Sequence, residues 1–136
     1  MSTKPSPDLP TFDNPKTARD YEIEIINPEF TCLCPVTGQP DFAIMRLRYI
    51  ADAQCLELKG LKLYFWSFRD QGCFHEAVTN QILDELVAAA APRAMELEAV
   101  FNIRGGISTR ITAQHGACDQ LKTAAPLKGL NPAVFA

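Results

Sequence analysis

The sequence has no long hydrophobic run and no excess of basic residues. Its longest apolar stretch, residues 86–92, is mostly alanine and is far shorter than the roughly 20 residues that a membrane-spanning helix needs. The amino terminus lacks the charged and then apolar segments of a signal peptide, so we expect a cytoplasmic protein without a membrane partner. The formal net charge of −3 argues against non-specific binding to nucleic acid, which depends on a basic surface.

Several common ligand-binding motifs are also missing. The sequence contains no G-x-G-x-x-G fingerprint, P-loop or serine nucleophile elbow, so a dinucleotide, if used, is not held by a Rossmann domain. Cys32 and Cys34 have no second Cys/His pair at zinc-finger spacing, and we therefore expect no metal. Five cysteines are an odd number, and a reducing compartment argues against a disulfide framework.

The composition is that of one globular domain. The 136 residues, 47% of them hydrophobic and 21% charged, suffice for one sizeable core. Residues 1–20 contain four prolines among polar side chains, which is typical of an arm that is poorly ordered or lies on a neighbouring subunit. The single catalytic domain is therefore expected to occupy residues 21–136.

Alternating apolar and polar side chains predict the strands. Residues 21–25 have the period of a half-buried strand, which Asn27 and Pro28 are expected to end. Two longer pairs of such segments predict antiparallel hairpins. These pairs are residues 42–49 with 54–58 and residues 95–103 with 107–112.

Apolar residues at helical spacing predict two helices between the hairpins. A short helix follows Gly60 and ends near residues 70–72, and a longer helix covers residues 74–91 and stops at Pro92, because proline cannot continue it. This order predicts an α+β fold in which both helices cover one face of an antiparallel four-stranded sheet. Exposed sheet edges on a short chain favour sheets joined between subunits, so we expect a cyclic homo-oligomer.

Residues 30–42 carry more reactive chemistry than a packed core requires. Cys34 precedes Pro35 and a Thr-Gly-Gln-Pro turn, which would lift the thiol clear of a strand and near backbone amides that favour a thiolate. From this stretch alone, a nucleophile and a small buried apolar residue are equally good interpretations of Cys34. Asp41 is either a general acid or base facing Cys34 or a turn residue that caps an amide.

Three other places could bind a ligand, and each has a structural alternative. His75 lies on the apolar stripe of the long helix, where a core histidine is the default interpretation. Glu76 suits either the helix dipole or a pair of N–H groups on a purine-like edge. Lys59 and Lys62 could hold phosphates or form a solvated basic face. Arg104 precedes two glycines, where backbone could approach a ligand, although hairpin turns also use glycines for purely conformational reasons.

Four segments in fixed order resemble one protein family. They are residues 30–42, 57–64, 67–76 and 104–106. Together they look like the NADPH-dependent 7-cyano-7-deazaguanine reductases of queuosine biosynthesis, in their short single-module form. The resemblance covers about residues 21–115, and one difference is Gly60, where the family usually has Ser or Ala.

This resemblance implies a tunnelling fold, the barrel shared with purine- and pterin-binding enzymes. Subunits of such a barrel join their sheets, active sites form at the interfaces, and the implied homo-oligomer is pentamer-based, a decamer. The implied reaction reduces the nitrile of a small deazapurine to a primary amine with two NADPH per turnover. The product feeds transfer-RNA modification, without direct nucleic-acid binding by the protein itself.

By position, the resemblance implies a set of substrate-site residues. Cys34 would be the nucleophile that forms a covalent thioimide, and Asp41 would transfer the proton. His75 would border the reacting nitrile and Glu76 would anchor the deazaguanine ring, while Phe74 would help to close the pocket against water.

The same resemblance implies a cofactor segment that begins at Glu57. Lys59 and Lys62 would hold NADPH phosphates, with Arg104 as a further candidate.

A cyclohydrolase-like enzyme with the same fold is the second possible function. It would need zinc, for which only His75 and His115 are available. A purine-binding or thiol-redox module without turnover is the third possibility.

Overall fold

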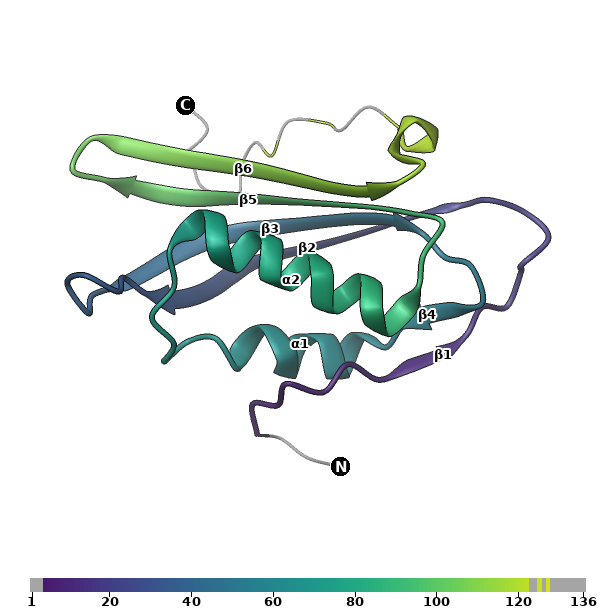
Figure 1. Cartoon of the computed structure of the whole chain (residues 1–136), viewed down its shortest axis with the longest axis horizontal. Helices are drawn as coiled ribbons and strands as arrows, with labels where there is room; N and C mark the ends of the chain where they lie inside the picture. The colour runs from purple at the N-terminus through teal and green to yellow at the C-terminus, as the bar shows by residue number, and fades with distance from the viewer. Residues whose placement is uncertain (1–3, 123–124, 126, 128–136) are drawn as a thin grey trace.

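Two helices cover one face of a four-stranded antiparallel sheet with the strand order β2-β3-β5-β6 (Figure 1). This is a computed structural model, and it describes residues 4–122, 125 and 127. The α+β prediction with both helices on one face of the sheet is confirmed. The elements are β1 Thr11–Asp13, β2 Glu22–Leu33, β3 Pro40–Ile50, β4 Gln54–Leu56, α1 Leu58–Trp66, α2 His75–Ala90, β5 Ala94–Arg104, β6 Ile107–Gly116 and the 3₁₀ turn η1 Cys118–Gln120.

The second predicted hairpin and the long helix form as expected. β5 pairs with β6 around Gly105 and Gly106, whose φ angles of 58° and 80° are in the left-handed region that favours glycine. α2 ends at Ala90, two residues before the buried Pro92. No described helix is long and apolar enough to cross a membrane.

The first predicted hairpin is wrong. β3 pairs with β2, not with the segment at residues 54–58, so its hairpin turn is residues 34–39. The cause is that β2 continues past Asn27 and Pro28 through a bulge between Asn27 and Phe30. Proline is tolerated there because β2 is the outer strand of this sheet and one of its edges needs no ladder hydrogen bond.

The amino-terminal arm contains a strand, whereas the sequence predicted no regular structure before Tyr21. β1 pairs with β4 in a separate two-stranded sheet. The arm also binds the start of α1, because the backbone N–H of Glu57 donates to the Pro10 carbonyl at 3.1 Å. The Pro10 ring lies so close to Gly60 that a Cβ on Gly60 would overlap it, which explains why glycine occupies this position.

Gly60→Ala is therefore expected to destabilise the protein. Alanine gains about 1 kcal/mol over glycine inside a helix, but overpacking costs about 1–3 kcal/mol. We expect a net loss of about 1 kcal/mol in the free energy of unfolding, measured with urea. Pro10→Ala removes the overlapping ring atoms, so Gly60→Ala should be neutral or stabilising in that background; an equal loss in both backgrounds would contradict the contact.

The core lies between the helices and the sheet. Val78, Ile82 and Leu86 of α2 are all 0% exposed, as the apolar stripe predicts. They pack with aromatic side chains from the strands and from α1 and the turn after it. The largest of these buried rings belong to Phe30, Tyr49, Tyr64, Phe68 and Phe101.

The opposite face of the sheet carries buried ion pairs. Arg46 bonds Glu98 at 2.7 Å and Arg48 bonds Glu96. The Ala125 carbonyl accepts a bond from Arg46 Nη1 at 2.5 Å, so this face is covered in part by residues that follow η1. Charged groups with these partners keep the strands in register, because each pair joins β3 to β5.

Candidate active site

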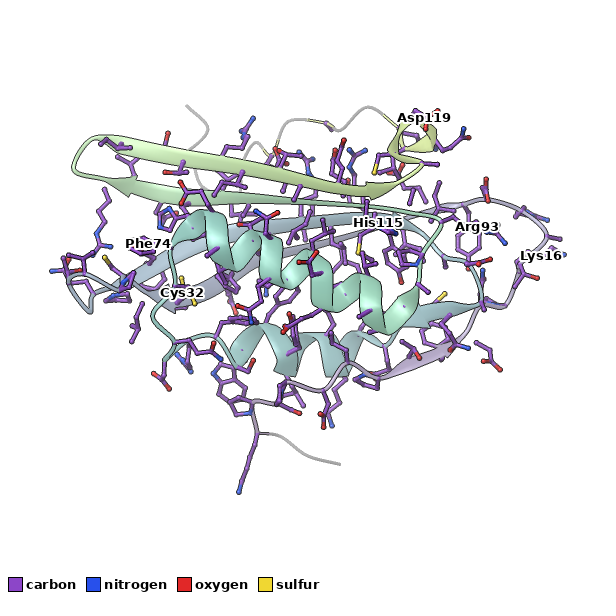
Figure 2. The ribbon with its side chains drawn as sticks, in the orientation of Figure 1. Lys16, Cys32, Phe74, Arg93, His115 and Asp119 are labelled. Carbon is purple, nitrogen blue, oxygen red and sulfur yellow. The ribbon has the colours of Figure 1, made fainter. Side chains whose placement is uncertain are left out.

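Three chain connections meet at one end of the sheet, on the left in Figure 1. They are the β2–β3 loop, the β5–β6 turn and the segment that leads into α2. The Leu33 N–H donates to the Gln71 carbonyl at 2.8 Å, and the Cys73 N–H donates to the Leu33 carbonyl at 2.9 Å. These bonds fix the start of α2 beside the residue that precedes Cys34. Figure 2 labels Phe74 and Cys32 at this end.

Cys34 is the first residue of the β2–β3 loop. Its backbone closes the loop, because its N–H donates to the Gln39 carbonyl and its carbonyl accepts from the Gly38 N–H, both at 2.8 Å. The hydroxyl and the backbone N–H of Thr37, followed by the Val36 N–H, lower the pKa of the half-buried Cys34 thiol. A loop that donates hydrogen bonds to sulfur favours the thiolate, which is the nucleophilic form.

Cys32 lies two residues earlier in a contrasting environment. It is 0% exposed, and burial raises the pKa of its thiol to about 12. Such a thiol is inert at neutral pH. The difference between the two cysteines favours Cys34 as the reactive one.

Thr37→Val is expected to raise the pKa of Cys34, because it removes the hydroxyl that donates to the thiolate. The alkylation rate of Cys34 by iodoacetamide at pH 7 should fall several-fold, and the midpoint of its pH profile should move up toward the ordinary cysteine value of about 8.5. Peptide mass mapping separates Cys34 from the other cysteines. Thr112→Val on the exposed face of β6 is the control, and an unchanged Cys34 profile in Thr37→Val would contradict the prediction.

Asp41 is a buried carboxylate on β3, 8% exposed. Its Oδ2 lies 3.2 Å from His75 Nε2, and its Oδ1 accepts a bond from the Arg104 guanidinium. Arg104 also donates to the Gln39 side chain. The sequence suggested Arg104 as a cofactor ligand, but the structure brings it to Asp41 and to the loop of Cys34.

His75 is not a core histidine, in contrast to the default interpretation of its helical position. Its ring stacks on Phe101 with centroids 3.6 Å apart and an interplanar angle of 1°, and its side chain is 26% exposed. His75 is the first residue of α2, where the apolar stripe leaves the core and reaches the end of the sheet. The imidazole is therefore held between an aromatic ring and the Asp41 carboxylate.

Phe74 and Glu76 flank His75 at the start of α2. Phe74 is 59% exposed, and Glu76 is exposed in the first helical turn. Within the described part of the chain, the Glu76 carboxylate forms no ion pair. Both side chains are therefore available to a ligand beside His75.

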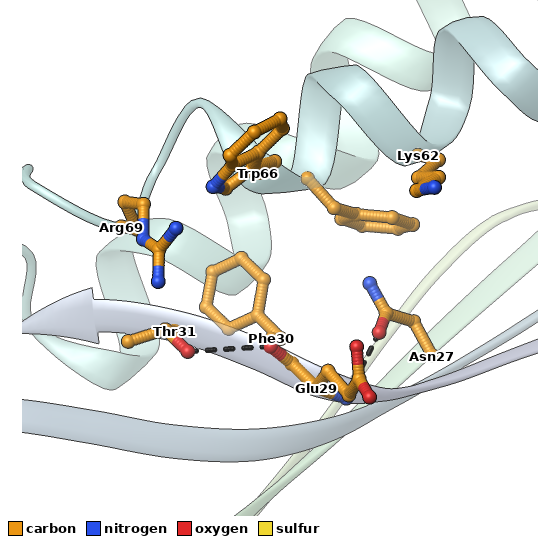
Figure 3. A pocket seen from close by; sticks show the side chains of 8 residues that line it. Asn27, Glu29, Phe30, Thr31, Lys62, Trp66 and Arg69 are labelled. Carbon is orange, nitrogen blue, oxygen red and sulfur yellow. Dashed lines mark hydrogen bonds between the residues drawn. The ribbon is translucent and has the colours of Figure 1, made fainter. Parts of the chain in front are cut away.

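The predicted cofactor segment forms the start of α1. Glu57 caps this helix, since its side chain accepts a hydrogen bond from the Gly60 N–H. The Glu57 carboxylate therefore already has a structural partner. Lys59 is half-buried and Lys62 is exposed. Lys62 also lines a cavity with Trp66 and Arg69 (Figure 3). The sequence analysis did not single out these two residues, although their spacing from Lys62 is helical.

No cluster of three or more His, Cys, Asp or Glu side chains in residues 4–122 could hold a metal ion.

Comparison with known proteins gives one consistent family. A family model described as "QueF-like protein" matches residues 40–120. A relative from Methylobacillus flagellatus is 64% identical over 115 residues, covering 85% of this chain and 83% of its own. A relative from Anaeromyxobacter dehalogenans is 63% identical over 116 residues, covering 85% and 95%. Both are named NADPH-dependent 7-cyano-7-deazaguanine reductase.

A solved structure shares the fold. It is the archaeosine synthase QueF-Like in the apo form, with a TM-score of 0.63 and 18% sequence identity, and the match covers 72% of this chain and 94% of that one. At this identity the similarity supports the fold alone.

Proposed function

The chain belongs to the QueF-like family, with relatives that are NADPH-dependent 7-cyano-7-deazaguanine reductases, and we propose that Cys34 performs their reaction by covalent catalysis. The protein is an oxidoreductase that reduces the nitrile of 7-cyano-7-deazaguanine to a primary amine in the queuosine pathway. The observation that carries this function is the identity of 63–64% over 85% of the chain.

The first step of the proposed mechanism is addition of the Cys34 sulfur to the nitrile carbon. A nitrile is a poor hydride acceptor, and a covalent thioimide divides one difficult reduction into easier steps. The lowered pKa of Cys34 supports this role. The new C–S bond uses the sulfur electron pair, and one C–N π bond becomes the N–H bond of the thioimide.

Asp41 and His75 are proposed to move the proton in this step. Asp41 pairs with Arg104 through Oδ1 and with His75 through Oδ2, so both carboxylate oxygens are held in place by hydrogen-bond partners. In the proposal, Asp41 takes the proton of the Cys34 thiol and returns it to the nitrile nitrogen, while His75 orients the carboxylate. Arg104 is a positioning residue that holds Asp41 toward the loop.

NADPH would supply two hydrides in succession, one for the thioimide carbon and, once the Cys34 thiolate has left, one for the imine carbon. Two hydrides and the protons added at nitrogen convert C≡N into CH₂–NH₂. Lys59 and Lys62 are proposed to bind its phosphates. Glu76 is proposed to accept hydrogen bonds from the ring N–H groups of the substrate, with Phe74 excluding water from the imine.

We also propose a homo-oligomer in which sheets join between copies. β2 and β6 are the outer strands of the described sheet, and each leaves an edge with unpaired backbone groups. A closed ring satisfies these groups, and the family resemblance suggests a pentamer-based decamer with active sites at the interfaces. Native mass spectrometry gives the subunit number directly.

The activity is tested by mixing the native protein with 7-cyano-7-deazaguanine and NADPH. Consumption of two NADPH for each 7-aminomethyl-7-deazaguanine detected by mass spectrometry is the expected result. A native protein that consumes no NADPH and forms no amine would refute the proposed function.

A further inference from the structure

Phe101 of β5 is a core residue that is covered by a polar ring. Its side chain is 1% exposed, and it belongs to the core between the sheet and the helices. An aliphatic side chain from the apolar stripe of α2 would bury this ring equally well. Instead, the His75 imidazole stacks on it with centroids 3.6 Å apart, and the Nε2 of that imidazole lies 3.2 Å from the Asp41 carboxylate.

A bulge in β5 brings Phe101 and Arg104 to the same face of the sheet. In a regular strand, residues three positions apart point to opposite faces. The register of β5 with β6 shifts between these two residues, and the extra residue reverses the alternation. One strand therefore places an aromatic ring against His75 and a cation beside Asp41, the two members of the proposed proton-transfer pair.

Asp41 lies on this face as well. β3 pairs with β5 so that Ala43 is opposite Phe101, and Asp41 precedes Ala43 by two residues, so both side chains point to the same side. Because alanine has a short side chain, the His75 imidazole can lie on the Phe101 ring and still reach Asp41. The ring, the imidazole and the carboxylate thus form one packed unit.

The orientation of the imidazole needs such a support. Rotation about the Cβ–Cγ bond of histidine has broad energy minima, and the His75 side chain is 26% exposed, so the core does not enclose it. The Phe101 ring is parallel to the imidazole within 1°. Tilting the imidazole would either produce a clash with this ring or lose the stacking contact. The direction in which Nε2 meets Asp41 therefore depends on Phe101.

We infer that Phe101 is a positioning residue for the proposed proton transfer from Cys34 through Asp41 to the nitrile nitrogen. It acts through His75: its ring holds the imidazole in the plane in which Nε2 meets Asp41 Oδ2, and this contact fixes the carboxylate that carries the proton. The inference rests on the proposed function, because it adds a residue to the site of that reaction.

Phe101→Leu is expected to lower the limiting rate of thioimide formation about 10- to 100-fold, because small displacements of a catalytic group have effects of this size. The rate is measured without NADPH by rapid quenching and intact mass spectrometry. The substrate concentration that gives half of the limiting rate should change little, since Glu76 is the proposed anchor of the substrate ring. Phe101→Met, which fills more of the lost volume with a flexible side chain, should behave in the same way.

Phe68→Leu is the matched control. Phe68 is 2% exposed in the same core, and its ring contacts Tyr64 and Phe30. Both leucine variants should melt below the native temperature, because each shortens a buried aromatic side chain, but only Phe101→Leu should slow adduct formation. Alkylation of Cys34 by iodoacetamide should proceed at the native rate in both variants, since the loop that surrounds the sulfur is unchanged.

A double-mutant cycle with His75→Gln separates positioning from a general loosening of the core. Because Phe101 acts through the imidazole, Phe101→Leu should have no further effect on the adduct rate once His75 is replaced, so the two losses should not add. Additive losses, an equal loss in Phe68→Leu, or rates within twofold of native in both Phe101 variants would overturn the role of Phe101 and leave the proposed function intact. A native protein that forms neither adduct nor amine would refute the proposed function and, with it, this role.

Discussion

Cys34→Ala protein is expected to form no covalent adduct with 7-cyano-7-deazaguanine and to lose at least about 10⁴-fold in kcat. Removal of a covalent nucleophile typically causes losses of this order or larger. The lost sulfur is the group that the Thr37 hydroxyl and the loop amides favour as thiolate. Without it, hydride would have to attack an unactivated nitrile.

Intact mass spectrometry without NADPH measures this effect directly. The native protein should gain the full mass of the substrate, because thiolate addition releases no atoms. Cys118→Ala is the matched control, since Cys118 is half-buried in η1 and its Sγ lies near the His115 carbonyl, outside the proposed site. An adduct that persists in Cys34→Ala, or its absence in the native protein, would contradict the thioimide.

The parts of the fold that the sequence predicted depend on local signals. The β5–β6 hairpin follows from two alternating segments around adjacent glycines, and α2 follows from a helical stripe that stops before Pro92. The pairing of β3 with β2 could not be predicted from such local signals. Pro28 is a strong strand breaker in an inner strand but not at a bulge in an outer strand, and strand order is not visible in the sequence.

Local signals in the sequence also indicate only part of the candidate site. The turn chemistry of the Cys34 loop left a reactive thiol and a buried thiol equally open. The family resemblance then favoured Cys34 as the nucleophile and selected Asp41, His75 and Glu76, whose roles stay predictions. The contact of Arg104 with Asp41 joins residues 63 positions apart, which no local pattern indicates. Helical period placed His75 in the core because period alone does not show where a helix extends beyond the sheet.

The cavity lined by Lys62, Trp66 and Arg69 does not follow from local signals either. Lys62, Trp66 and Arg69 recur at intervals of four and three residues, the spacing of one helix face. The sequence could therefore have suggested a stripe. The cavity also needs the bulge of β2 that lies opposite α1. From the sequence alone, Pro28 predicts the end of the strand and not a bulge within it.

Asp41→Asn is expected to lower kcat by about 10²- to 10⁴-fold, the usual contribution of a positioned acid or base. Asparagine keeps the shape of the side chain and its bond to Arg104, but it cannot take the Cys34 proton and return it to the nitrile nitrogen. The loss should therefore appear in the rate of adduct formation without NADPH, where hydride transfer plays no part. Arg104 is only partly buried, with its side chain 40% exposed, so loss of its charge pair should cost little stability.

Two further variants separate proton transfer from positioning. Arg104→Met leaves the carboxylate in place but removes its partner, so the adduct rate should fall less than in Asp41→Asn, and Arg104→Lys should restore part of it. Asp84→Asn, an exposed aspartate on α2, is the control. An adduct rate in Asp41→Asn within threefold of the native value would remove Asp41 from the mechanism and leave His75 as the group that transfers the proton.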